Sequence, residues 1–129
     1  MRLRLASIAV VFLVFGLSVA HAQYIEIYKL DSLMKDIPES MALSSVASNL
    51  SVPADTLKQE KAEYKVTLGE LYVAHQIAKL SNSDLKSVMT DSKSKAWGEV
   101  AKARNIDMDQ IKNSSKNLEK SLREASSKK

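Results

Sequence analysis

The stretch that decides the fold occurs twice, as Val46-Ala-Ser-Asn-Leu-Ser-Val-Pro-Ala-Asp-Thr-Leu-Lys58 and, 54 residues later, as Val100-Ala-Lys-Ala-Arg-Asn-Ile-Asp-Met-Asp-Gln-Ile-Lys112. Val, Ala, Asp and Lys are identical at the matching positions. Each copy ends one helix, turns about an aliphatic residue (Val52 or Ile106) and starts another helix with an acid in its first turn, which suits the positive end of the helix dipole. A fainter third copy begins at Ile77. We therefore predict a helix-turn-helix packing unit that is used two or three times.

A helix-turn-helix can also read DNA, but the start of its second helix argues against that role here. DNA-reading versions place Arg, Lys, Asn or Gln at this point, where they reach base edges and phosphates. The second copy has Asp107 and Asp109 there, and the first has Pro53 and Asp55. We therefore interpret the unit as a packing device and do not expect nucleic acid as a partner.

The rest of the chain is also typical of helices, because its 129 residues include only three glycines and two prolines. Thr67-Leu-Gly-Glu70 is a capping box that predicts the start of the strongest helix. The one strand-like run, Tyr24 to Leu30, has no second run to pair with, and we expect it to start a helix or form an arm on the core. Asp31 or Ser32 is expected to cap a short helix, and Asp107 the last one. The sequence thus predicts an all-α fold, a compact bundle of five to six short helices built from repeated helix-turn-helix units.

The predicted core consists of apolar residues that recur at helical spacing on these segments. Trp97 belongs to this set because aliphatic residues follow it at helical spacing; the alternative is an exposed tryptophan that anchors a partner. Gly98 beside it is expected to let another helix approach closely. The full set is Val46, Val52, Leu57, Leu71, Ile77, Trp97, Val100, Ala101, Ile106 and Ile111.

The first 22 residues have the layout of a secretory signal peptide. A short basic start precedes the apolar run from Leu5 to Leu17, and Ala20-His-Ala22 provides small residues at a cleavage site. The apolar run is shorter than the ~20 residues of a membrane helix. We therefore predict cleavage after Ala22, a periplasmic or secreted protein and no stable membrane span once the leader is removed. The expected organisation is a signal peptide (1–22), a single helical domain (23–126) and a frayed tail (127–129).

Removing the leader changes the electrostatics of the chain. Arg2 and Arg4 leave with it and no acid does, so 17 basic and 15 acidic side chains remain and the net charge falls from +4 to +2. A nearly neutral domain is a poor general binder of polyanions. The chain has no cysteine, which excludes disulfides and cysteine-ligated metals. We expect no cofactor and no metal.

Three motifs resemble a group of small, uncharacterised secreted bacterial helical proteins. They are Thr67-Leu-Gly-Glu-Leu71, Val73-Ala-His75 and Ala96-Trp-Gly-Glu-Val-Ala-Lys102, and the group shares a Trp-Gly-Glu-(Ile/Val)-Ala-Lys motif. The resemblance covers Val46 to Ile111 and implies a helical fold and export, without any catalytic residue. Ala103-Arg-Asn105 stands where the group has Glu-Leu-Gly. Because Asn tolerates the left-handed conformation, the turn is expected to survive this difference.

His75 is the only histidine outside the leader. A single histidine cannot complete a metal site, and beside aliphatic residues it is usually a partly buried packing residue. An acid–base role would need a carboxylate from elsewhere, such as Glu70, Asp84 or Glu99. The chain has no G-x-S-x-G elbow and no phosphate-binding glycine loop. We therefore do not predict an enzyme, although a small periplasmic enzyme built on His75 remains the alternative.

The candidate interaction surface combines aromatic residues near the start of the domain with a basic last helix. Between Lys112 and the final residue, six basic side chains stand against two acidic ones. Such a helix can dock on a partner protein, or it can bind an anionic glycan or lipid of the cell envelope. Our first hypothesis is an exported, non-enzymatic protein-interaction module, and the envelope binder is the alternative. The surface residues are Tyr24, Tyr28, Lys112, Lys116, Lys120 and Arg123.

Overall fold

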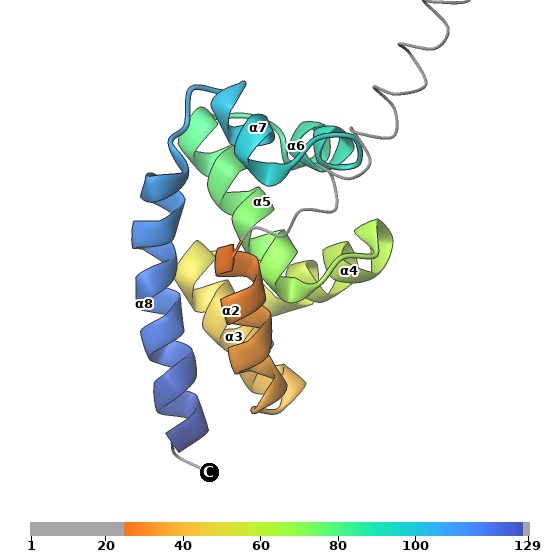
Figure 1. Ribbon diagram of the computed structural model, residues 1–129. Helices are drawn as coiled ribbons and strands as arrows, with labels where there is room; N and C mark the ends of the chain where they lie inside the picture. The colour runs from red at the N-terminus through yellow and green to blue at the C-terminus, as the bar shows by residue number, and fades with distance from the viewer. Residues whose placement is uncertain (1–24, 128–129) are drawn as a thin grey trace, which may run out of the picture.

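The computed structural model describes residues 25–127, and within that range the chain forms seven α-helices and no strand (Figure 1). The all-α prediction is confirmed. There is one helix more than the upper expected number. The strand-like run starts a helix, which is one of the two outcomes expected for it. The predicted leader and Tyr24 lie outside the described residues. The helices are α2 (Ile25–Lys35), α3 (Glu39–Leu50), α4 (Ala54–Tyr64), α5 (Leu68–Ser81), α6 (Leu85–Ser92), α7 (Trp97–Lys102) and α8 (Met108–Ser127).

Helix α5 is the centre of the bundle. Nine of its 14 residues are buried, so it is apolar on nearly every side, as expected of a helix enclosed by others. Helices α2, α3, α4, α6 and α8 all pack against it, and the long α8 also covers α2, α3 and α7. Figure 1 shows α8 running along the side of the molecule, with α6 and α7 gathered at one end.

Four of the connections between helices share one turn design. Each turn contains a residue in the left-handed conformation, with φ between 55° and 60°, and the next helix starts three residues later. The residue after it donates its N–H to the carbonyl five positions back, which is a Schellman motif. The turns of the two clear copies and the faint third copy are therefore confirmed, and the α4–α5 turn is a fourth that has no sequence counterpart. The left-handed residues are Ser51, Lys65, Asn82 and Asn105, and the bonds are Val52 to Ala47, Val66 to Lys61, Ser83 to Ala78 and Ile106 to Ala101.

We expect Lys65→Gly to stabilise the protein. Lys65 is exposed, with φ 56° and ψ 50°, a conformation that is unfavourable for a residue with a Cβ and free for glycine. After allowing for the greater entropy of glycine in the unfolded chain, the gain is about 0.5–1 kcal/mol. Lys58→Gly, in the middle of the same helix, is the control and should cost about 1 kcal/mol. Urea denaturation measures both, and a loss of stability in Lys65→Gly would contradict this description of the turn.

The predicted core is confirmed at nine of its ten positions, including Trp97, which is 9% exposed. Val52 is the exception: it is only partly buried and packs against the edge of the core, because it lies in the turn itself. The prediction for Gly98 is wrong. No heavy atom lies within 4 Å of the position that its Cβ would occupy, so no helix uses the space that this glycine leaves.

A close approach between α2 and α5 occurs instead at Gly69. Its N–H donates a hydrogen bond of 2.9 Å to Asp31 Oδ1. A Cβ at this position would stand 2.6 Å from that oxygen and 3.0 Å from the carbonyl oxygen of Ile27. Asp31 thus binds a free N–H at the start of α5 from a neighbouring helix. The prediction that Asp31 or Ser32 caps a helix of its own is wrong, because α2 already begins at Ile25.

Two predicted caps are confirmed. Thr67 Oγ1 accepts from the N–H of Glu70 at 3.1 Å, and Glu70 Oε1 accepts from the N–H of Thr67 at 3.0 Å, which completes the capping box. Asp107 Oδ1 accepts from the N–H of Asp109 at 3.0 Å. Asp107, one of the acids that argue against DNA binding at this turn, therefore caps the start of α8.

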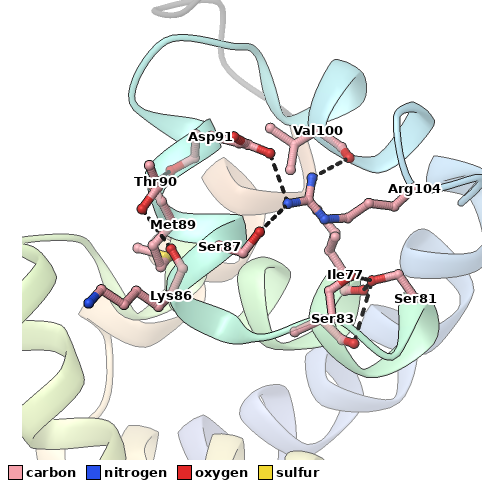
Figure 2. Close-up of polar contacts among 12 residues, drawn as sticks. Ile77, Ser81, Ser83, Lys86, Ser87, Met89, Thr90, Asp91, Val100 and Arg104 are labelled. Carbon is pink, nitrogen blue, oxygen red and sulfur yellow. Dashed lines mark hydrogen bonds and ion pairs between the residues drawn. The ribbon is translucent and has the colours of Figure 1, made fainter.

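Arg104, in the α7–α8 turn, ties α7 to α6. Its Nη2 lies 2.8 Å from Asp91 Oδ2 and donates to Ser87 Oγ at 2.9 Å, and its Nη1 donates to the carbonyl of Val100 at 3.2 Å. Figure 2 shows the guanidinium held between the two helices, where the side chain is only 12% exposed. Sequence alone does not predict these contacts, although the four-residue spacing of Ser87 and Asp91 does place both on one face of α6.

Candidate interaction surface

The outer face of α2 carries apolar side chains that the bundle does not bury. Ile27 and Leu30 face the core, whereas Ile25 is 67% exposed and Tyr28 is 63% exposed. The two exposed residues are three apart and therefore neighbours on one helical turn. The sequence of α2 could have indicated this exposure, because its apolar residues are spread too widely around the helix for all of them to lie in one buried stripe. Tyr28 belongs to the interaction surface predicted from the sequence, whereas Ile25 does not.

Two grooves border this exposed turn. The first, which we call the α2–α8 groove, has a volume of about 480 Å³ and is lined by Ile25, Tyr28, Lys29, Ser32, Leu33, Asp36 and Arg123. The second has a volume of about 710 Å³ and is lined by the other side of α2, the start of α3, Lys61 of α4 and the α4–α5 turn. Both volumes fall in the range of about 300–1,000 Å³ that is typical of ligand-binding clefts. Tyr28 lines both grooves.

The four basic residues predicted on α8 form a stripe that meets the α2–α8 groove at Arg123. Their spacing of four, four and three residues places them on one helix face, and all four are exposed. Arg123 lines the groove together with Tyr28, so the two halves of the predicted surface meet in space. We call this set the basic stripe: Lys112, Lys116, Lys120 and Arg123.

A carboxyl pair lies beneath this surface, where α2 packs on α8. The side chain of Glu26 is 5% exposed, and its Oε2 accepts a hydrogen bond of 3.2 Å from the buried Ser115 hydroxyl. Burial raises the pKa of Glu119, and the hydrogen bond and negative charge of Glu26 raise it further, against the opposing charges of Lys29 and Arg123. The junction between the two helices is thus easiest to form when one carboxyl carries a proton.

Because the carboxyl groups of Glu26 and Glu119 meet at this junction, we expect the protein to lose stability as pH rises above the ordinary pKa of a glutamate. The folded chain holds a proton on Glu119 at pH values where the unfolded chain has released it, so the free energy of unfolding falls as pH rises through the raised pKa. Glu119→Gln keeps the hydrogen bonding and removes the titration. We expect it to flatten the stability profile from about pH 4.5 to 7 and to stabilise the protein at the upper end.

The comparison needs urea denaturation at several pH values, with Glu124→Gln as the control. Glu124 is an exposed acid on the same helix, and its replacement should leave the slope unchanged. Identical slopes for wild type and Glu119→Gln would contradict the account of the junction.

His75 has a partner, but none of those predicted. Its Nε2 lies 2.7 Å from Glu60 Oε1, and the two side chains are 16% and 21% exposed. Glu60 belongs to α4, so the pair joins α4 to α5. His75 also lines a pocket of about 410 Å³ that includes Asp84 and Ser83. Glu70 is engaged in its capping box. The carboxylate that His75 contacts therefore comes from elsewhere in the chain, as an acid–base role would need, but it is Glu60 and none of the three examples named from the sequence.

Two further polar features lie elsewhere in the bundle. A polar pocket between α3 and α8 is lined by serine and asparagine side chains and by no acid or base. Burial raises the pKa of Tyr72 to about 12, so its hydroxyl stays protonated. Among residues 25–127, no three His, Asp or Glu side chains gather in a way that would hold a metal ion. Within the same residues, no helix has the length and apolar character needed to cross a bilayer.

Comparison with known proteins gives no relative on which a function could rest. The chain matches no protein-family model, no curated protein and no solved structure.

Proposed function

We propose that the protein is an exported, non-enzymatic interaction module that binds another protein through the exposed turn of α2 and the grooves beside it. The observation that carries the proposal is the exposure of Ile25 and Tyr28 on one turn, with Arg123 in the same groove. Single exposed apolar residues are ordinary on protein surfaces. A tyrosine and an arginine that share a groove with an exposed isoleucine match the composition of binding hot spots.

The non-catalytic part of the proposal rests on the contacts of the polar groups that chemistry would need. His75 and Glu60 join α4 to α5, and Arg104 and Asp91 join α7 to α6. Their bonds are short and serve the packing of neighbouring helices. The enzyme alternative would gain support if His75→Gln kept its fold and lost a cellular phenotype that Glu60→Gln also lost.

The exported part of the proposal rests on the signal-peptide layout of residues 1–22. Fractionation of the host with N-terminal sequencing of the recovered protein tests it. We expect a chain that begins at Gln23 and lies outside the cytoplasmic membrane. A chain recovered from the cytosol with its leader intact would overturn export and would reopen the DNA-reading interpretation.

Site-specific photo-cross-linking in the host tests the binding face. A photoreactive residue at position 28 should give a discrete cross-linked product, because Tyr28 lies between the two grooves. The control is position 80, since Leu80 is also an exposed apolar residue, 43% exposed, and lies far along the chain on α5. Equal cross-linking at both positions, or none at position 28, would contradict the proposed face.

A specific observation also favours the envelope-surface alternative. Within residues 25–127, no carboxylate oxygen lies within 4.0 Å of the ammonium groups of Lys112, Lys116 and Lys120. Charges that are free in this way would also suit an anionic glycan or lipid. Sedimentation with anionic vesicles tests this alternative, and binding that is insensitive to salt would exclude it.

A further inference from the structure

We infer that the partner is an acidic amphipathic helix that lies in the α2–α8 groove, with its apolar side on Ile25, Tyr28 and Leu33 and its carboxylates toward the basic stripe. This inference rests on the proposed function, because it names the chemistry of the partner for the same face.

The charges around the groove indicate that the partner's charge is negative. Lys29 and Arg123 line the groove, and their acid contacts are both 3.7 Å long and made to carboxyl groups that lie beneath the surface. The side chains of Lys29 and Arg123 remain 52% and 65% exposed. Asp36 is the one acid that lines the groove. With two basic residues against one acid, the lining is cationic and would attract carboxylates. The three free lysines of the basic stripe lie on the same face of α8 as Arg123.

The shape of the face indicates a helix. Glu26, near the start of α2, accepts a hydrogen bond from Ser115 of α8. The two helices run in the same direction, as Figure 1 shows. From Ile25 to Asp36 the groove extends over about 16 Å, or three helical turns. A groove between two helices, with an apolar floor and a charged rim, is the usual seat of a third amphipathic helix.

The same features fit a lipid surface less well than they fit a partner helix. A peripheral membrane helix inserts large apolar side chains, usually Trp, Phe or Leu, from the side opposite its basic face. On α8 the large apolar residues Ile111, Leu118 and Leu122 are all buried in the core, so they are not available for insertion. The two most exposed large apolar residues among residues 25–127, Ile25 and Tyr28, stand on α2, beside concave grooves that a flat membrane would leave unfilled.

A binding assay with a defined peptide tests the inference. The probe is a fluorescein-labelled helical peptide of about 14 residues, four turns, with leucine on one face and glutamate elsewhere. A matched peptide carries lysine in place of glutamate. Fluorescence anisotropy is measured with the protein purified in the form that its host accumulates. We expect binding of the acidic peptide only, with affinity falling about tenfold or more between low and high salt.

Variants locate the binding. Tyr28→Ser should weaken it about tenfold, the loss expected of a hot-spot residue. The double variant Lys116→Glu/Lys120→Glu should weaken it at least as much. Lys58→Glu/Lys86→Glu makes the same change in net charge at exposed positions on α4 and α6, and it should leave binding intact. Circular dichroism establishes that each variant folds.

Three results would overturn the inference: equal affinity for both peptides, no binding of the acidic peptide, or equal losses in the two charge-reversal variants. Binding to phosphatidylglycerol-containing vesicles without binding to the peptide would assign the face to anionic lipid. A discrete cross-link at position 28 without peptide binding would mean that the face docks a partner of different chemistry. Failure of both experiments would remove the proposed function as well.

Discussion

Gly69→Ala is expected to lower the free energy of unfolding by about 2–4 kcal/mol, more than any other substitution considered. The added Cβ would stand 2.6 Å from Asp31 Oδ1 and 3.0 Å from the carbonyl oxygen of Ile27. The carboxylate must move, which breaks its bond to the N–H of Gly69, and the Ile27 carbonyl belongs to the backbone of α2 and yields little. The gain in helix propensity, about 1 kcal/mol, does not offset these costs.

Gly98→Ala is the matched control, because it makes the same chemical change on a helix with open space around it. It should be neutral or stabilise the protein by up to about 1 kcal/mol. Asp31→Ala in the Gly69→Ala background should recover part of the loss, since the side-chain clash is removed. Urea denaturation of the four proteins measures these effects. If Gly69→Ala were as stable as Gly98→Ala, the close packing of α2 on α5 would be refuted.

Arg104→Ala is expected to cost about 2 kcal/mol, the effect of losing charge-assisted hydrogen bonds in a largely buried setting. Arg104 contacts Ser87, Asp91 and the carbonyl of Val100. Its loss leaves Asp91, 35% exposed, without its ion pair and frees α6 from the α7–α8 turn. Arg104→Lys should fall between wild type and alanine, because an ammonium cannot reproduce the planar fork of the guanidinium.

Lys61→Ala provides the comparison for a surface ion pair. Lys61 lies 3.4 Å from Glu39, and the two side chains are 37% and 64% exposed, so the cost should stay below about 1 kcal/mol. Thermal unfolding followed by circular dichroism measures both variants. Similar midpoints for Arg104→Ala and Lys61→Ala would show that the Arg104 contacts do not hold the short helices in place.

Local features of this fold could be predicted from the sequence, because neighbouring residues determine them. The Thr67–Glu70 capping box and the left-handed turns at Ser51 and Asn105 depend on residues within one helical turn. The α4–α5 turn has the same geometry, yet it escaped prediction because Lys65 and Val66 carry no turn-specific signal. The β-branched and aromatic residues of the run from Tyr24 to Leu30 favour strands, and with no partner strand a helix start or an arm on the core is expected. The helix start is what the chain forms, stabilised by burial of Ile27 and Leu30.

The candidate site divides in the same way. Tyr28 and the basic stripe could both be proposed as surface residues from the sequence. For the basic stripe, exposure follows from the spacing of its residues on one helix face. That Tyr28 and Arg123 line the same groove could not be predicted, because it depends on how α2 lies along α8. His75 illustrates the same limit: its partner Glu60 stands on the preceding helix, and only the angle set by the Lys65 turn brings the two together. Asp31 was misread for a similar reason, because its hydrogen bond crosses to Gly69 of α5.

The most direct test of the central claim is the size of the native protein in extracts of its host, measured by gel filtration for wild type, Tyr28→Ser and Leu80→Ser. Tyr28 and Leu80 are both exposed, but only Tyr28 lies between the grooves. If the protein binds its partner through this face, wild type and Leu80→Ser elute in a complex larger than the free chain, and Tyr28→Ser shifts to the position of the free chain. Elution of wild type and both variants at the same position would contradict an interaction through this face.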